Sequence, residues 1–175
     1  IIDVLKNINQ KLIHRHPNVF GDTEIRTAEE QTVNWERMKN KENSDRSIID
    51  GVPGQLPALL RAHRIQAKAA TVGFDWDDAE GVWNKVEEEL EEIKQAVIQK
   101  DQKKIEEEFG DLLFSLVNLS RFLKVNPEDA LRMSVEKFSR RFRELEARIK
   151  RQNQSIHEMT LEEMDAVWEK VKKDG

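Results

Sequence analysis

Apolar residues recur at helical spacing along the first quarter of the chain. Positions three and four apart predict a helix over residues 1–15. A second run of this kind, with Thr27 as its N-cap, predicts a helix over residues 27–42. Residues 43–56 are rich in Ser, Gly and Pro and break the pattern. We therefore expect two helices followed by a linker.

The same periodicity returns after the linker and indicates further helices. Asn126 followed by Pro127 is a strong helix start, with Asn as N-cap and Pro at the first helical position. Thr160 followed by Glu163 forms a capping box. The helices predicted in this part of the chain span about 57–71, 78–100 and 102–124, then run from 127 through the stripe ending near 149, and finally from 161 to about 172.

Composition supports an all-α fold. The 175 residues include only 7 Gly and 4 Pro, and 36% are charged, which leaves a densely charged surface around a helical core. The short polar connection at residues 99–104 favours antiparallel packing of the two helices that it joins. We therefore predict an antiparallel helical bundle.

Several functional classes are excluded or disfavoured by composition. The chain has no Cys, so it can form no disulfide, zinc thiolate or catalytic thiol. No apolar run approaches 18 residues, so we expect no membrane partner. No signal peptide is visible, and we expect a cytoplasmic protein. The net charge of −5 argues against a nucleic-acid partner.

Two acidic pairs carry the candidate chemistry. Glu89 with Glu92, and Glu108 with Asp111, are each spaced i, i+3, which places both carboxylates on one face of a helix. If the two helices pack side by side, four carboxylates converge. Hard oxygen ligands of this kind select Mg²⁺, with Mn²⁺ as an alternative. The competing interpretation is that the glutamate run at 87–92 is a solvated helix face.

The second acidic helix is apolar nearly all round, which predicts a buried helix. A polar stripe nevertheless runs along it through Glu108, Asp111, Ser115 and Asn118. Buried acids without a partner are costly, so the stripe indicates a bound ligand or metal. Gly110 lies mid-helix, where close approach of a neighbour or ligand would explain it.

The candidate cations each have two interpretations. Lys137 and Arg141, four residues apart, are either surface side chains or contacts to phosphate. Lys104 precedes Glu108 by four residues and forms either a salt bridge with it or a phosphate contact.

The remaining candidates are aromatic or amide side chains. Trp76 and Trp168 are either core residues or members of a nucleotide pocket that stack on a base. Asn118 either donates to a phosphate or satisfies a buried neighbour.

Residues Glu88-Glu89-Leu90-Glu91-Glu92 form an EExxE motif, and Glu108-Phe109-Gly110-Asp111 form an ExxD motif on the next predicted helix. In these motifs the sequence resembles the MazG nucleoside triphosphate pyrophosphohydrolase family. The phrases Val72-Gly73-Phe74-Asp75-Trp76 and Asn118-Leu119-Ser120-Arg121 extend the resemblance. It covers most of the chain and matches the C-terminal half of two-domain MazG proteins. A faint internal repeat then suggests that residues 1–42 end an incomplete upstream copy, residues 43–56 are a linker and residues 57–175 form a complete catalytic domain.

The resemblance implies an all-α NTP-pyrophosphatase fold that forms a homodimer. It implies Mg²⁺-dependent hydrolysis of a broad range of nucleoside triphosphates to nucleoside monophosphate and pyrophosphate. The implied roles are metal ligation by Glu89, Glu92, Glu108 and Asp111, phosphate contacts by Lys104, Lys137 and Arg141, and a nucleotide pocket that includes Trp168, with Glu88 as a candidate base. Dimeric dUTPases and phosphoribosyl-ATP pyrophosphohydrolases share the acidic motif and stay open as alternatives, as does a non-catalytic helical interaction module.

Overall fold

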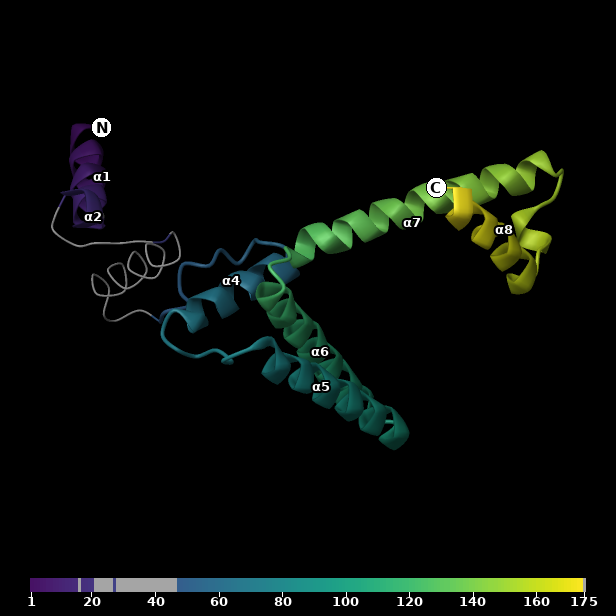
Figure 1. Cartoon of the computed structure of the whole chain (residues 1–175), viewed down its shortest axis with the longest axis horizontal. Helices are drawn as coiled ribbons and strands as arrows, with labels where there is room; N and C mark the ends of the chain where they lie inside the picture. Colours follow the sequence, from purple (N-terminus) through teal and green to yellow (C-terminus); the bar gives the residue numbers. More distant parts are fainter. Residues whose placement is uncertain (16, 21–26, 28–46, 175) are drawn as a thin grey trace. The chain divides into compact units, whose positions relative to one another are not determined.

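The computed structural model describes residues 1–15, 17–20, 27 and 47–174. Across these ranges every regular element is a helix and none is a strand, which confirms the all-α prediction (Figure 1). The helix predicted over residues 27–42 lies outside the described residues, apart from Thr27. The helices are α1 (Ile2–Arg15), α2 (Pro17–Phe20), α4 (Ala58–Ala70), α5 (Ala79–Gln99), α6 (Gln102–Phe122), α7 (Pro127–Arg151), the 3-10 helix η1 (Ile156–Glu158) and α8 (Leu161–Asp174).

The helix ends follow from local capping. Asp78 accepts hydrogen bonds from the backbone N–H groups of Glu80 and Gly81 and so starts α5. The predicted caps of the last two long helices are confirmed. Asn126 accepts from the backbone of α7, and Thr160 exchanges hydrogen bonds with Glu163 at the start of α8.

A very short connection makes α5 and α6 antiparallel neighbours, as predicted. Lys100 ends α5 in the left-handed conformation at φ 56°, and Asp101 immediately caps α6. The two helices then pack along each other (Figure 1). This hairpin fixes which residues of α5 face which residues of α6.

The chain forms two compact units, residues 1–124 and residues 125–175. In the first unit, α4 and α5 both pack against α6. In the second unit, α7 packs against α8. The buried core of the first unit gathers Val82, Val86 and Leu119, and that of the second gathers Leu145, Ile149, Val167 and Val171. The predicted repeat and its boundaries at residues 42 and 56 stay a prediction.

The expectation that α6 is buried all round is wrong. Phe109, Leu113, Phe114 and Leu116 are each between 41% and 53% exposed. Among the described helices, α4 and α5 pack extensively on α6, and these residues remain on an open apolar face. Gly110 is not explained by a close neighbour either, because a Cβ at this position would meet no described atom within 4 Å.

Among the described helices, none combines the length and apolar character needed to cross a membrane.

Candidate functional site

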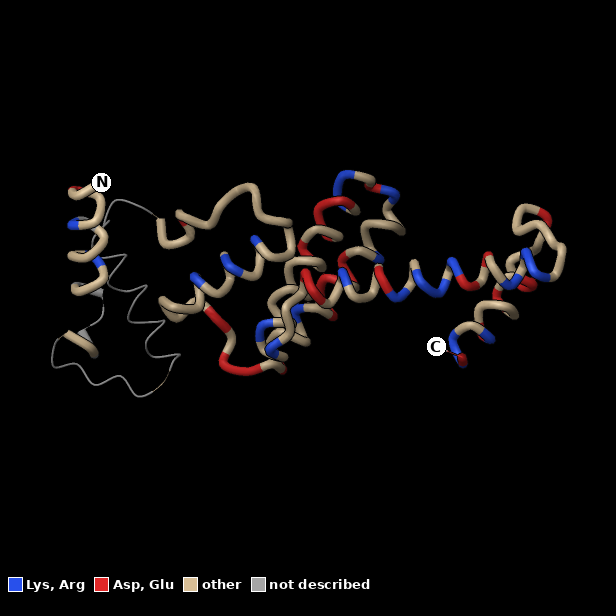
Figure 2. The backbone as a smooth tube through the Cα atoms, turned by 90° about the horizontal axis from the view of Figure 1, so that it is seen from above, with Lys and Arg blue, Asp and Glu red and all other residues tan. Residues whose placement is uncertain are grey.

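Three of the four predicted carboxylate ligands converge where α5 packs on α6. Glu89, Glu108 and Asp111 each place an oxygen within 4.8 Å of the others. Glu89 is 3% exposed and Glu108 is 9% exposed, whereas Asp111 faces solvent. Acidic positions of both helices are marked in red in Figure 2. The expectation that Asp111 is buried is therefore wrong, and the cluster has one open side through which a ligand could enter.

The fourth predicted ligand, Glu92, lies beside Glu108. Burial raises the pKa of Glu108, and the charge of Glu92 together with a hydrogen bond between the two carboxyl groups raises this pKa further. Lys104 opposes the shift, with its Nζ 3.8 Å from Glu108 Oε1. The structure thus places Glu92 beside the cluster of Glu89, Glu108 and Asp111, and the charges of Glu92 and Glu89 disfavour ionisation of Glu108.

Glu89 is held by only one of its two oxygens. Its Oε1 accepts from Lys85 Nζ at 2.7 Å, and Lys85 also donates to Glu88 Oε1 at 2.9 Å. These bonds raise the pKa of Lys85 and keep it charged. Sequence reasoning missed Lys85, although its spacing of i, i+4 from Glu89 was a usable signal.

The second oxygen, Glu89 Oε2, is buried and has no hydrogen-bond partner among the described residues. A buried carboxylate oxygen without a partner is costly. A divalent cation with a preference for oxygen ligands would satisfy it and would also offset the repulsion with Glu108 and Asp111. The residues present therefore fit a hard divalent cation.

The other predicted residues of this region have local partners. Glu88 is exposed and paired with Lys85. Lys104 forms the i, i+4 salt bridge with Glu108 that was one of its two interpretations. Asn118 is 4% exposed, and its Oδ1 accepts from the Arg121 guanidinium, so it does satisfy a buried neighbour.

Trp76 and Asn118 also line a pocket in the first unit, between α4, α6 and the segment 74–76. Its volume is about 190 Å³. Ligand sites for drug-sized molecules are about 300–1,000 Å³, so this pocket fits a ring system and not a whole nucleotide. Its lining combines aromatic rings with buried polar side chains, namely Gln66, Phe74, Trp76, Phe114, Ser115 and Asn118.

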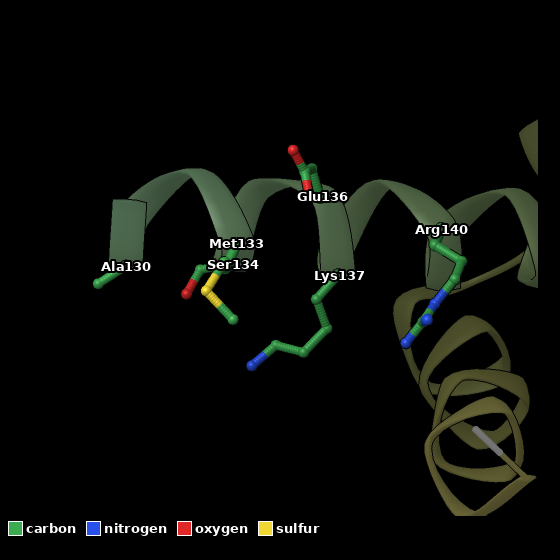
Figure 3. A pocket seen from close by; sticks show the side chains of 6 residues that line it. All are labelled: Ala130, Met133, Ser134, Glu136, Lys137 and Arg140. Carbon is green, nitrogen blue, oxygen red and sulfur yellow. The ribbon is translucent and has the colours of Figure 1, made fainter. Parts of the chain in front are cut away.

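Lys137, Arg141 and Trp168 belong to the second compact unit, whereas the carboxylates belong to the first. Lys137 and Arg140 extend from the same side of α7, and Glu136 points the other way (Figure 3). Arg141 Nε is buried with no hydrogen-bond partner within the described ranges. Trp168 packs against the core of its unit and lies 5.3 Å from the Phe138 ring, between centroids, in accord with the core interpretation.

The fold and the cluster define a class: an all-α protein with a carboxylate site for a divalent cation on two antiparallel helices. The family model of the MazG nucleotide pyrophosphohydrolase domain matches residues 78–145, which contain the whole cluster. The chain belongs to the MazG family of nucleoside triphosphate pyrophosphohydrolases, as the motifs indicated.

The similarity extends well beyond the cluster. The chain is 48% identical over 174 residues to the nucleoside triphosphate pyrophosphohydrolase/pyrophosphatase MazG of Thermotoga maritima, covering 98% of this chain and 66% of that protein. It is 43% identical over 178 residues to the nucleoside triphosphate pyrophosphohydrolase of Escherichia coli K12, covering 98% of this chain and 67% of that protein. The chain thus spans about two thirds of the length of these relatives, not the half that was expected.

Proposed function

We propose that this protein hydrolyses nucleoside triphosphates to the nucleoside monophosphate and pyrophosphate. Two findings support the proposal: membership of a family of nucleoside triphosphate pyrophosphohydrolases, and the unpartnered buried oxygen of Glu89 within the carboxylate cluster. The second finding carries more weight for mechanism, because carboxylates that lie this close together stay ionised more easily when a cation binds between them.

Each carboxylate has a proposed task. Glu89, Glu92, Glu108 and Asp111 would hold Mg²⁺ or Mn²⁺. When bound, such a cation polarises the phosphoryl oxygens and lowers the pKa of water. Lys85 orients Glu89 through Oε1 and leaves Oε2 free to ligate.

Further residues are proposed to accept the proton of the attacking water and to neutralise the negative charge of the phosphates. Glu88 is the candidate to accept a proton from the water that attacks the α-phosphorus, and Lys85 orients its carboxylate. Lys104, Lys137 and Arg141 are the candidate phosphate contacts. The buried, unpartnered Nε of Arg141 supports its role, since a phosphate oxygen would accept a hydrogen bond from it.

The two alternative enzymes differ from the proposed one in substrate range, and the third alternative is a helical interaction module that catalyses no reaction. A dUTPase would act on dUTP alone, and a phosphoribosyl-ATP hydrolase on phosphoribosyl-ATP, whereas the proposed enzyme accepts a broad set. Family membership and the buried, unpartnered Oε2 of Glu89 disfavour a purely structural role for the glutamates.

We also propose a homodimer. The open apolar face of α6 and the exposed apolar stripe of α7 support it, because exposed patches of this kind mark interfaces. The exposed residues are Phe109, Leu113 and Leu116 on α6 and Leu131, Val135 and Phe138 on α7. Sedimentation velocity of the parent protein tests whether it is a dimer.

A cytoplasmic location and the absence of a nucleic-acid partner stay expectations from the sequence.

The decisive test compares Glu108→Gln with Glu107→Gln. The two residues are neighbours on α6, but Glu108 lies in the cluster and Glu107 is exposed. With UTP or dATP and Mg²⁺, we expect pyrophosphate release to fall by more than tenfold in Glu108→Gln and to stay at the parent level in Glu107→Gln. Release within tenfold of the parent in Glu108→Gln would refute the assigned role.

A further inference from the structure

The pocket between α4 and α6 contains a buried amide that none of the roles above uses. Gln66 lies on α4 and is 7% exposed. Its Nε2 donates to the backbone carbonyl of Phe114 on α6 at 2.8 Å. Since only the NH₂ end of an amide can donate to a carbonyl, this bond fixes which end of the side chain faces which way.

The other end of the amide is an acceptor without a donor. Gln66 Oε1 is buried and has no hydrogen-bond partner in the part of the chain that the structure describes. Gln66 lines the pocket together with three aromatic side chains, Phe74, Trp76 and Phe114. A buried acceptor left unsatisfied is costly, so an occupant of the pocket that brings a donor to Oε1 is favoured.

The chemistry of the pocket identifies that occupant. Its aromatic lining offers stacking faces to a flat ring. Its volume of about 190 Å³ admits one ring system. A nucleobase carries both a π-face and N–H groups at its edge, whereas a sugar carries hydroxyls but no face to stack.

We propose that Gln66 determines base specificity by accepting a hydrogen bond from an N–H group of the nucleobase of the substrate. This inference rests on the proposed hydrolysis of nucleoside triphosphates. The inferred contact is to the base and not to the phosphates, so Gln66 sets the relative kcat/KM of different bases and not the chemistry at phosphorus. A site built to hydrogen-bond an N–H group rejects the analogue that lacks it, because the acceptor is then left unpaired.

The test uses nucleotide pairs that differ in one N–H group. The pairs are ATP with purine riboside triphosphate, CTP with its 4-deamino analogue, GTP with ITP, and UTP with 3-methyl-UTP. In the parent protein we expect at least one pair to differ tenfold or more in kcat/KM. In Gln66→Met, which keeps the side-chain length but removes the acceptor together with the donor to Phe114, we expect that ratio to fall to within about twofold of one.

Ratios are measured on one preparation, so they do not depend on the fraction that is folded. Gln66→Glu keeps an acceptor oxygen but loses the Nε2 donor to the Phe114 carbonyl, so it is expected to retain only part of the preference. If no pair is discriminated, or if Gln66→Met leaves every ratio unchanged, the inference is wrong. The inference is also wrong if Gln66→Met changes only the ratio of kcat/KM for ATP to that for 3′-deoxy-ATP. That result would show that Oε1 contacts the sugar.

The outcome separates this inference from the function on which it rests. A parent protein that releases no pyrophosphate from any triphosphate overturns the proposed function. If the parent protein releases pyrophosphate but substitution of Gln66 leaves the kcat/KM ratios of all nucleotide pairs unchanged, only the role of Gln66 is overturned.

Discussion

Arg121 on α6 donates to both carboxylate oxygens of Asp75, with Nη2 2.7 Å from Oδ2 and Nη1 3.3 Å from Oδ1. The same guanidinium donates to Asn118. This fork ties the segment that contains Trp76 to α6, and thereby closes one side of the pocket.

Arg121→Lys is expected to loosen this segment. Lysine keeps the charge but cannot form the two-pronged contact, and the pair is largely shielded from water, with 14% and 24% of the two side chains exposed. We expect a loss of about 1.5–3 kcal/mol in unfolding free energy and a raised KM for the triphosphate with kcat nearly unchanged. Denaturant unfolding and steady-state kinetics measure both.

Arg132→Lys is the matched control for this substitution. Arg132 also contacts two carboxylates, those of Asp129 and Glu136, but it is 59% exposed. Exposed pairs contribute about 0–1 kcal/mol, so the control should change little. If Arg121→Lys and Arg132→Lys lose the same free energy of unfolding, the contact of Arg121 with Asp75 is no more stabilising than an exposed ion pair.

Gly81→Ala is expected to displace Trp76. A Cβ at residue 81 would overlap Trp76 Cδ1, so the indole must move. Ala is otherwise about 1 kcal/mol better than Gly inside a helix. Gly110→Ala, in the open middle of α6, should show that gain in stability, whereas Gly81→Ala should show none and should shift the tryptophan emission spectrum. A full gain in Gly81→Ala with unchanged emission would contradict the contact.

Mg²⁺ is expected to raise the melting temperature of the parent protein. A ligand that binds only the native state stabilises it, by about 2.7 kcal/mol at a hundredfold excess over Kd. Glu89→Gln removes the charge of the most buried ligand and should abolish most of the shift. Glu91→Gln on the same helix, where Glu91 is exposed and paired with Lys94, should retain it. Scanning calorimetry with and without Mg²⁺ measures the shift in melting temperature. The same shift in Glu89→Gln and Glu91→Gln would exclude Glu89 as a ligand.

His63 on α4 predicts a pH dependence of stability. Burial, then the charges of Arg121 and Arg64, lower its pKa below the ordinary value of 6.5. As the pH falls below 6.5, the unfolded chain binds a proton that the native chain does not, so stability is lost until native His63 is protonated as well. We expect His63→Gln to lose less stability than the parent between pH 7.5 and pH 5.5.

His157→Gln serves as the control for this titration, since His157 is exposed and belongs to the second unit. It should follow the parent curve. Parallel curves for His63→Gln and the parent would contradict the assignment.

The longer helices of the described chain and the four acidic candidates could be predicted from the amino-acid sequence, whereas the short α2 and η1 were not. Helical period and caps are local properties, so the starts at Asn126 and Thr160 could be predicted from a few neighbouring residues. The i, i+3 spacing within α5 and within α6 placed each acidic pair on one face for the same reason.

Which of these groups are buried, and which have hydrogen-bond or ion-pair partners, follows from the packing of the helices. Burial depends on which elements cover a helix, and that cannot be read from the period of one helix alone. Thus α6 has an open apolar face, Asp111 faces solvent, and Gln66 on α4 meets Phe114 on α6 across 48 residues of chain. The unpaired oxygens of Glu89 and Gln66, which carry the proposed function and the further inference, exist only because distant helices come together.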